Sequence, residues 1–193
     1  MKLLEDRIIA DAKVLRGDIL NVGSFLNQQV DIGLFKEIGE EFARRFLGKR
    51  ITRILTVETS GMGIACITAQ YFNNVPVVFA RKHRTKNMSN NVYSANVTSF
   101  TTGIDYTVTV SREYLQEDDS VLLIDDFLAN GHALEGLVTI VKEAGAALVG
   151  AGVVIEKGFQ DGGKRLRSKD IPIESLAIIE SMSPEGGIQF RAS

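Results

Sequence analysis

The spacing of apolar residues along the chain predicts helices alternating with strands. The clearest helical pattern follows Asp31, a good N-cap, and runs to about Leu47, where Gly48 ends it. Four aromatic or aliphatic residues lie on one face of this helix: Phe35, Ile38, Phe42 and Phe46. Similar patterns predict three further helices, over Leu3–Lys13, Gly61–Phe72 and Ala133–Ala144.

Short apolar runs rich in β-branched residues predict the strands between these helices. The runs that look buried are Ile51–Val57, Val75–Ala80, the run that starts at Val121, and Ala147–Ile155. Val92–Phe100 and Tyr106–Ser111 alternate as a hairpin would, and shorter extended pieces are expected at Asp18–Asn21, Ile171–Ala177 and Gly187–Arg191. Alternating strands and helices predict an α/β fold, a mostly parallel twisted sheet with helices on both faces.

Composition narrows the class of protein. A chain of 193 residues with 45% hydrophobic content suits one domain, and a net charge of −2 argues against a broad nucleic-acid surface. Cys66 is the single cysteine, so no intrachain disulfide can form and a reducing compartment is the simplest setting. The N-terminus lacks the apolar core of a signal peptide, and no apolar segment approaches a membrane-spanning length. We therefore expect a cytoplasmic protein without nucleic-acid or membrane partners.

The segment Val121–Ala133, VLLIDDFLANGHA, carries the most chemical information. Asp125 and Asp126 end an apolar run, and the carboxyl ends of strands are where open α/β sheets bind ligands. The following residues, Ala129–Ala133, offer backbone N–H groups to an anion at a helix N-terminus. Carboxylates accept hydrogen bonds from sugar hydroxyl groups, and the neighbouring loop can bind a phosphate. Together they indicate a phosphorylated sugar as the ligand. The alternative is that the two acids only cap the following loop.

A second loop with anion-binding character, Glu58–Gly63, joins another buried strand to another helix. Gly61-x-Gly63 lacks the third glycine of a dinucleotide fingerprint, and no Gly-Lys-Ser or Gly-Lys-Thr loop of a P-loop nucleotidase occurs. Alone, the segment is equally well explained as a tight turn. Together with Ala129–Ala133 it predicts two anion sites at one edge of the sheet.

The distribution of charge supports this prediction. No Asp or Glu occurs from Thr59 to Ile104, whereas Arg81, Lys82 and three further basic residues follow a predicted strand there. A local positive potential attracts polyanions, although a solvated basic loop is the alternative interpretation. The polar segment Arg81–Asn91 has the residue types of a mobile lid.

Val121–Ala133 resembles the phosphoribosyl-pyrophosphate (PRPP) motif of type I phosphoribosyltransferases. Other segments are similar to the bacterial xanthine phosphoribosyltransferases, namely Asn21–Asp31 (NVGSFLNQQVD), Val57–Ala65, Val75–His83 (VPVVFARKH) and Val154–Phe159 (VIEKGF). Asn130 replaces a common Thr and His132 a common Gly; the Ala-Asn-Gly sequence fits the xanthine branch. The resemblance covers nearly the whole chain and implies the type I phosphoribosyltransferase fold, a single domain 1–193, with a small base-binding hood from residues 1–30 and the C-terminal tail.

The resemblance implies that phosphoribose passes from PRPP to xanthine in purine salvage. It assigns the 5-phosphate to Ala129, Asn130, Gly131, His132 and Ala133, and the ribose to Asp125 and Asp126. It assigns the pyrophosphate to Thr59, Ser60, Arg81 and Lys82. Mg²⁺ is expected to arrive with PRPP, without a dedicated protein site, and a homodimer is implied.

The purine site is implied to include Leu20, Asn27 and Lys157. Lys157 follows an apolar strand, so it lies at a carboxyl end, where an exposed lysine without a role is the alternative. Phe127 either stacks on the purine or belongs to the core.

Three alternatives to this enzyme remain open. One is a phosphoribosyltransferase that prefers guanine or hypoxanthine. Another is a PRPP-sensing regulator built on the same domain, although the segment before Asp31 is short for an added DNA-binding domain. The third is an inactive scaffold or an RNA-binding relative.

Overall fold

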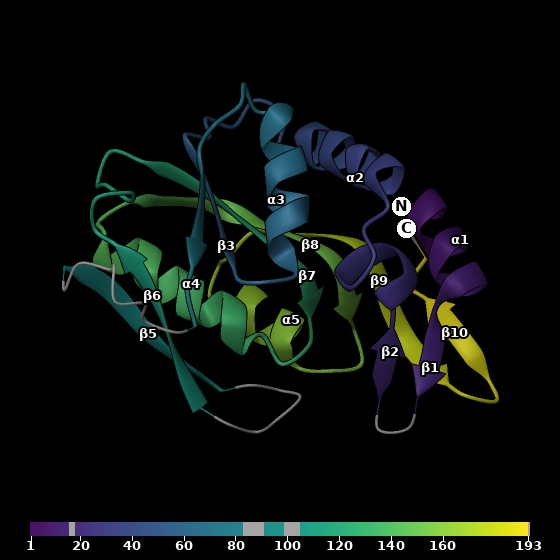
Figure 1. Cartoon of the computed structure of the whole chain (residues 1–193). Coiled ribbons are helices and arrows are strands. Elements are labelled where there is room, and N and C mark those ends of the chain that lie inside the picture. The colour runs from purple at the N-terminus through teal and green to yellow at the C-terminus, as the bar shows by residue number, and fades with distance from the viewer. Residues whose placement is uncertain (16–17, 83–90, 99–104, 193) are drawn as a thin grey trace.

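A central six-stranded sheet dominates the computed structural model, which describes residues 1–15, 18–82, 91–98 and 105–192 (Figure 1). The strand order is β10-β9-β8-β7-β3-β4, and only the pairing of β10 with β9 is antiparallel. The strands are β3 (Arg53–Val57), β4 (Val77–Ala80), β7 (Ser120–Leu128), β8 (Ala147–Lys157), β9 (Ile173–Ser183) and β10 (Gly187–Phe190). The predicted mostly parallel sheet is confirmed.

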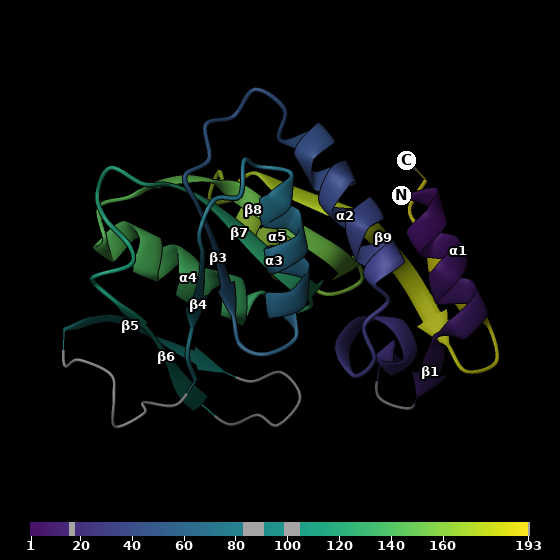
Figure 2. The same ribbon diagram turned by 45° about the horizontal axis from the view of Figure 1, so that its top comes forward.

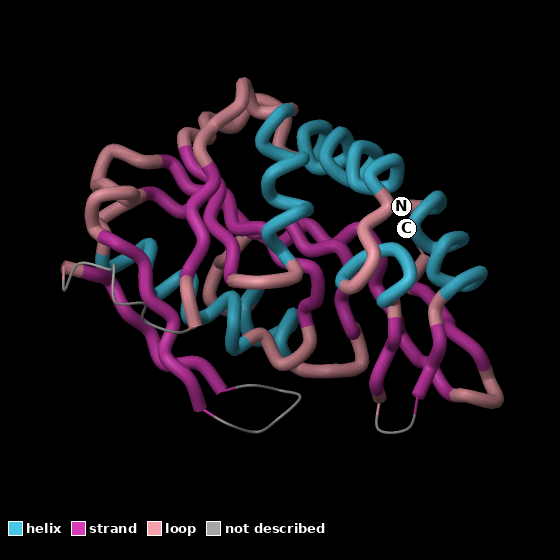
Figure 3. The backbone as a smooth tube through the Cα atoms, in the orientation of Figure 1, coloured by secondary structure: helices cyan, strands magenta, loops and turns pink. Residues whose placement is uncertain are grey.

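Helices cover both faces of this sheet, as Figures 2 and 3 show. On one face lie α2 (Ile32–Arg45) and α3 (Gly61–Gln70), and on the other lie α4 (His132–Glu143) and α5 (Gly162–Arg167). The predicted N-cap is confirmed, because the Asp31 carboxylate accepts a hydrogen bond of 3.1 Å from the N–H of Leu34. The predicted apolar face of α2 is buried in the core.

A separate antiparallel hairpin, β5 (Val92–Thr98) and β6 (Asp105–Ser111), packs against α4 and confirms the predicted pair. Gly136 permits this close approach, because a Cβ there would lie 2.5 Å from Cγ2 of Val97. The hairpin is joined to the end of β4 by two backbone hydrogen bonds of 2.9 Å between Arg81 and Thr109.

The N-terminal segment lies beside β9 and β10 at one end of the sheet (Figures 1 and 2). It comprises α1 (Lys2–Asp11), β1 (Lys13–Leu15), β2 (Ile19–Asn21) and a π-helical turn, η1 (Gly23–Asn27). The predicted helix Leu3–Lys13 is confirmed except at its end, since Lys13 already pairs with Asn21 in the small hairpin. The strand β1, the turn η1 and the helix α5 were not predicted from the sequence.

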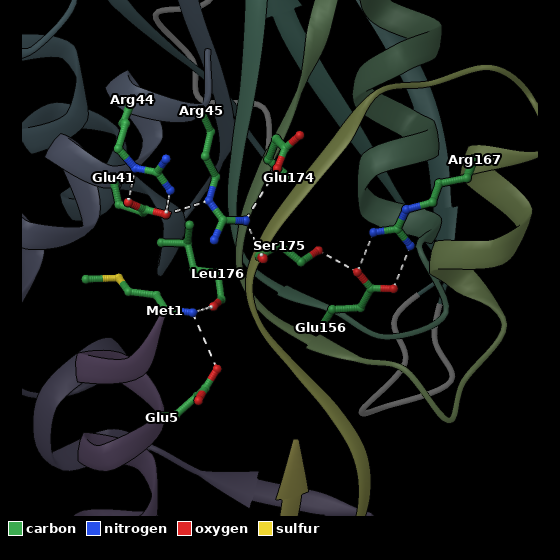
Figure 4. A network of polar contacts seen from close by, with 10 residues as sticks. All are labelled: Met1, Glu5, Glu41, Arg44, Arg45, Glu156, Arg167, Glu174, Ser175 and Leu176. Carbon is green, nitrogen blue, oxygen red and sulfur yellow. Dashed lines mark hydrogen bonds and ion pairs between the residues drawn. The ribbon is translucent and has the colours of Figure 1, made fainter. Parts of the chain in front are cut away.

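A polar network fastens these parts together (Figure 4). The amino group of Met1 donates to the carbonyl of Leu176 at 2.5 Å, and Arg45 of α2 donates to the carbonyl of Ser175 at 2.9 Å. The hydroxyl of Ser175 donates to Glu156, which also forms a two-bond ion pair with Arg167 of α5. The chain's first residue, α2, β8, β9 and α5 are thereby linked.

The order of the strands in the sheet predicts where a ligand binds. From β3 the chain proceeds to β4 on one side, whereas from β7 it proceeds to β8 on the other. In open α/β sheets such a reversal leaves a crevice at the carboxyl ends of the two strands, where ligands bind. No helix in the described part of the chain is long and apolar enough to cross a membrane.

Candidate active site

A cavity of about 520 Å³ lies at the carboxyl ends of β3, β7 and β8. It receives side chains from the loop after β3, from the end of β7 with the loop that follows it, and from the N-terminal segment. Most predicted site residues line it: Leu20, Asn27, Ser60, Lys82, Asp125, Asp126, Phe127, Ala129, Asn130, Gly131, His132, Ala133 and Lys157. Residues far apart in the sequence thus form one site.

The carboxylate pair lies within β7, because pairing with β8 continues to Leu128, beyond the predicted end of the strand. Asp125 and Asp126 are 4% and 8% exposed, and the N–H of Asp126 donates to the Asp125 carboxylate at 3.0 Å. Burial raises the pKa of Asp125 well above its usual value, and the neighbouring Asp126 raises it further. A positive charge placed beside Asp125 would lower this pKa again.

The loop Ala129–Ala133 turns from β7 into α4. Gly131 caps the helix with a φ of +79°, a left-handed conformation that favours glycine. Among the described residues, no acceptor takes a hydrogen bond from the backbone N–H groups of Gly131, His132 and Ala133. His132 instead contacts the carbonyl of Thr98 in β5 through Nδ1, at 3.3 Å. The loop has the features of an anion site.

The loop after β3 faces the same cavity through Glu58 and Ser60. The Glu58 carboxylate accepts a hydrogen bond of 2.7 Å from the N–H of Lys82, which ties this loop to the end of β4. Nζ of Lys82 lies 5.3 Å from the centroid of the Tyr106 ring, and its charge opposes the rise in the pKa of Asp125. Lys82 therefore brings a cation to the carboxylate pair.

Two predicted residues do not line the cavity. Thr59 is exposed, and the peptide bond that joins it to Glu58 is cis. The guanidinium of Arg81 lies over the Phe79 ring, 5.9 Å from its centroid. Their assignment to pyrophosphate stays a prediction, and most of the predicted lid, residues 83–90, lies outside the described residues.

Lys157 is the last residue of β8 and is 6% exposed. Its ammonium donates a hydrogen bond of 2.6 Å to the carbonyl of Asp18 and lies 5.9 Å from the Phe127 ring centroid. Burial lowers the pKa of Lys157, and the negative charge of Asp18 acts in the opposite direction. Phe127 both lines the cavity and packs against the core, so its two interpretations are compatible.

Sequence reasoning missed part of the lining. The N-terminal segment contributes five further residues, Leu15, Ile19, Asn21, Val22 and Gln28, and Val57, Thr98, Tyr106 and Leu134 line the cavity elsewhere. The amide residues in NVGSFLNQQVD were the available clue, since amides both donate and accept. Burial and the charge of Asp125 raise the pKa of the Tyr106 phenol above its usual value.

Metal-ligating side chains do not cluster in the described residues, where no three of His, Cys, Asp and Glu come together. Three carboxylates in the described residues line the cavity, those of Asp125, Asp126 and Glu58. A divalent ion held there would need most of its ligands from a substrate or water.

Comparison with known proteins agrees with this geometry. Residues 29–190 match the phosphoribosyl transferase domain, so the chain is a phosphoribosyltransferase by family. The adenine phosphoribosyltransferase of Trypanosoma brucei shares the fold, with a TM-score of 0.75 at 22% identity over 91% of this chain and 78% of that one.

The sequence relatives narrow the family. The xanthine phosphoribosyltransferase of Clostridium novyi is 57% identical over 191 residues, which is 99% of this chain and 100% of the relative. That of Bifidobacterium adolescentis is 51% identical over the full length of both chains. The chain therefore belongs to the bacterial xanthine phosphoribosyltransferases.

Proposed function

We propose that this protein transfers the 5-phosphoribosyl group of PRPP to xanthine, forming xanthosine 5′-monophosphate and pyrophosphate in purine salvage. The observation that carries the proposal is the single cavity shared by the carboxylate pair, the Ala129–Ala133 loop and Lys157. A sugar, a phosphate and a purine fit these three features in that order. The names of the close relatives support xanthine as the base.

The 5-phosphate binds to the N–H groups of Ala129–Ala133 at the positive end of α4. Asp125 and Asp126 accept hydrogen bonds from the ribose hydroxyls. In the reaction the bond from C1′ to the pyrophosphate oxygen breaks as the bond from C1′ to the purine nitrogen forms. Positive charge that develops on the sugar is stabilised by the nearby buried carboxylates.

The pyrophosphate lies between Ser60 and Lys82, with Thr59 and Arg81 as further contacts. Ser60 and Lys82 line the cavity near the carboxylates, which supports this direction for the leaving group. Mg²⁺ is expected to arrive with PRPP and would supply charge neutralisation for the leaving pyrophosphate. Asp125 and Asp126 are the residues that would hold this ion, because Mg²⁺ prefers carboxylate oxygens as ligands.

The base lies against Leu20, Asn27, Phe127 and Lys157. The ammonium of Lys157 donates to an oxygen of xanthine and favours its readily formed anion. Asn27 meets a base edge that both donates and accepts. These groups position the base, and the reaction proceeds mainly by orientation and electrostatics.

The wider organisation follows from the same proposal. The chain forms one domain, in which residues 1–30 and the C-terminal tail make a hood over the base. The contacts of α1 and β1 with β9 support a hood built from both ends of the chain. We further expect a homodimer in the cytoplasm.

The test is release of pyrophosphate by the purified protein with PRPP, Mg²⁺ and each purine base in turn. The proposal expects release with xanthine and much less with adenine, guanine or hypoxanthine. Binding of PRPP with no release of pyrophosphate would instead support a PRPP-sensing regulator.

A further inference from the structure

Arg165 in α5 contacts the back of the Ala129–Ala133 loop without lining the cavity. Its guanidinium donates a hydrogen bond of 2.5 Å to the carbonyl of Asn130. Two further bonds, of 3.1 and 3.0 Å, join it to the carboxylate of Glu135 in the first turn of α4. One side chain therefore holds both the loop and the helix that the loop begins.

The contact with Arg165 fixes the orientation of the peptide between Asn130 and Gly131. The peptide between Asn130 and Gly131 is trans, so its carbonyl and its N–H point in opposite directions. A carbonyl fixed toward Arg165 turns the N–H of Gly131 away from the guanidinium. Gly131 is among the residues that line the cavity.

We propose that Arg165 is a positioning residue for phosphate binding: by holding the Asn130 carbonyl, it orients the Gly131 N–H toward the 5-phosphate. The inference rests on the proposed function only in that the phosphate belongs to a phosphoribosyl group. A guanidinium bound to the carbonyl also polarises the peptide and makes its N–H a stronger donor.

The helix α5 is a firm support for this contact. A Cβ at Gly162 would lie 2.1 Å from the Ala129 carbonyl oxygen and 2.5 Å from the Asn130 carbonyl carbon, so α5 packs directly on the loop backbone. The helix is held in turn by Arg167, whose two hydrogen bonds to Glu156 of β8 are both 2.7 Å. The backbone that carries Arg165 is therefore held in place relative to the loop.

Glu135 provides a second route by which Arg165 affects an anion. Its carboxylate lies in the first turn of α4 and would repel a phosphate at that helix end. Arg165 and Lys169, whose Nζ is 2.7 Å from Glu135, both offset this charge. Replacing Arg165 therefore removes a contact to Asn130 and also a counter-charge to Glu135, and the two effects need separate variants.

The experiment measures binding of ribose 5-phosphate to the full chain by titration calorimetry. Arg165→Met is expected to weaken binding about tenfold, in line with loss of a charge-assisted hydrogen bond, and Arg165→Lys should restore part of it. Lys169→Met is the matched control, because it removes a cation from Glu135 and leaves the Asn130 contact intact. The control is expected to change binding less than twofold. Circular dichroism of each variant verifies that it is folded.

A Glu135→Gln background separates the two routes. We expect Arg165→Met to weaken ribose 5-phosphate binding in this background as well, and to raise KM for PRPP while KM for the base stays unchanged. Unchanged ribose 5-phosphate affinity in folded Arg165→Met, or a loss that disappears with Glu135→Gln, would overturn the inference. Since ribose 5-phosphate binding needs no base, failure to use xanthine would count against the proposed function alone.

Discussion

The ammonium of Lys157, at the end of β8, donates a hydrogen bond of 2.6 Å to the backbone carbonyl of Asp18, just before β2. This bond joins the carboxyl edge of the central sheet to the N-terminal hairpin across the cavity wall. Lys157 lines the cavity, so the bond fixes the ammonium beside the space where the base is proposed to bind. The proposed purine site therefore combines the end of β8 with the N-terminal segment.

Replacement of Lys157 by Met should separate base binding from PRPP binding. We expect kcat/KM for xanthine to fall about 10- to 100-fold, because a charged hydrogen bond to the base is lost, with KM for PRPP nearly unchanged. Steady-state kinetics with each substrate varied measures both constants. Lys36→Met on the exposed face of α2 is the control and should behave as wild type. An unchanged kcat/KM for xanthine in Lys157→Met would exclude its role in the base site.

Replacement of both Asp125 and Asp126 by Asn should depress kcat by about 100-fold or more, since two carboxylates beside the developing charge are lost. The fold should remain, because Asn fits the same space. Single-turnover rates with PRPP and xanthine measure the effect, with circular dichroism as the check on folding. Near-normal turnover would refute the assignment of this pair to the ribose.

Asp125→Asn alone should stabilise the protein. The pKa of Asp125 is raised in the folded state by burial and by Asp126, so ionisation costs folding free energy. That cost is absent below the unfolded pKa near 3.8 and grows as the pH rises toward the folded pKa. Thermal melts should therefore show a gain of about 1 kcal/mol, or about 3 °C in Tm, near neutral pH and little gain in acid.

Asp119→Asn is the contrasting variant for this measurement. Asp119 is also buried, at 6% exposure, but it accepts hydrogen bonds from Thr52 and Gln116 and lies 3.4 Å from Arg53. Its replacement should lower Tm. If both variants shift Tm in the same direction, the interpretation of Asp125 as an electrostatically costly group is wrong.

Lys82 and Arg81 should differ although both were assigned to pyrophosphate from the sequence. Lys82 lines the cavity, whereas the Arg81 guanidinium lies over Phe79. We expect Lys82→Gln to raise KM for PRPP about tenfold and Arg81→Gln to raise it less, because phosphate contacts depend on a nearby cation. A larger effect from Arg81→Gln would mean that its side chain moves to the pyrophosphate in the complex.

Glu156→Gln should weaken the folded state at neutral pH. Burial acts to raise the pKa of Glu156, but Arg167 and Ser175 together lower it below its ordinary value of 4.5. The ion pair therefore stabilises the fold above that pH and loses its contribution as the pH falls through the lowered pKa. Urea unfolding at neutral pH should show a loss of about 2 kcal/mol, which shrinks in acid. The exposed pair of Glu180 with Arg191 is the control, and Glu180→Gln should cost about 0.5 kcal/mol or less.

Local sequence patterns correctly predicted the elements that depend only on neighbouring residues, such as a helix cap or a buried apolar strand. Asp31 caps α2 as predicted, and the apolar run from Val121 is a central strand. The turn from β7 into α4 lies where the sequence predicted it, because a buried strand, small residues and a helix follow one another in sequence. Such features depend on neighbours along the chain and are therefore visible without the fold.

The missed elements depend on contacts between distant residues. The helix α5 has only six residues, starts with two glycines and has one buried apolar side chain, Leu166, so it lacks a helical pattern. Tyr106 reaches the cavity only because β6 crosses beside β4, and no local rule predicts that crossing. Arg81 and Lys82 are adjacent and chemically alike, so the sequence cannot tell which of them lines the cavity. In the structure the Arg81 guanidinium lies over the Phe79 ring instead.

The central claim is that one cavity joins a phosphoribosyl site to a xanthine site. Its most direct test is a competition in which PRPP, Mg²⁺ and equal concentrations of xanthine, guanine and hypoxanthine are incubated with the protein and the nucleotide products are quantified. Xanthosine monophosphate is expected to be the main product, with one pyrophosphate released for each nucleotide formed. Predominance of the guanine or hypoxanthine nucleotide, or no nucleotide at all, would contradict the claim.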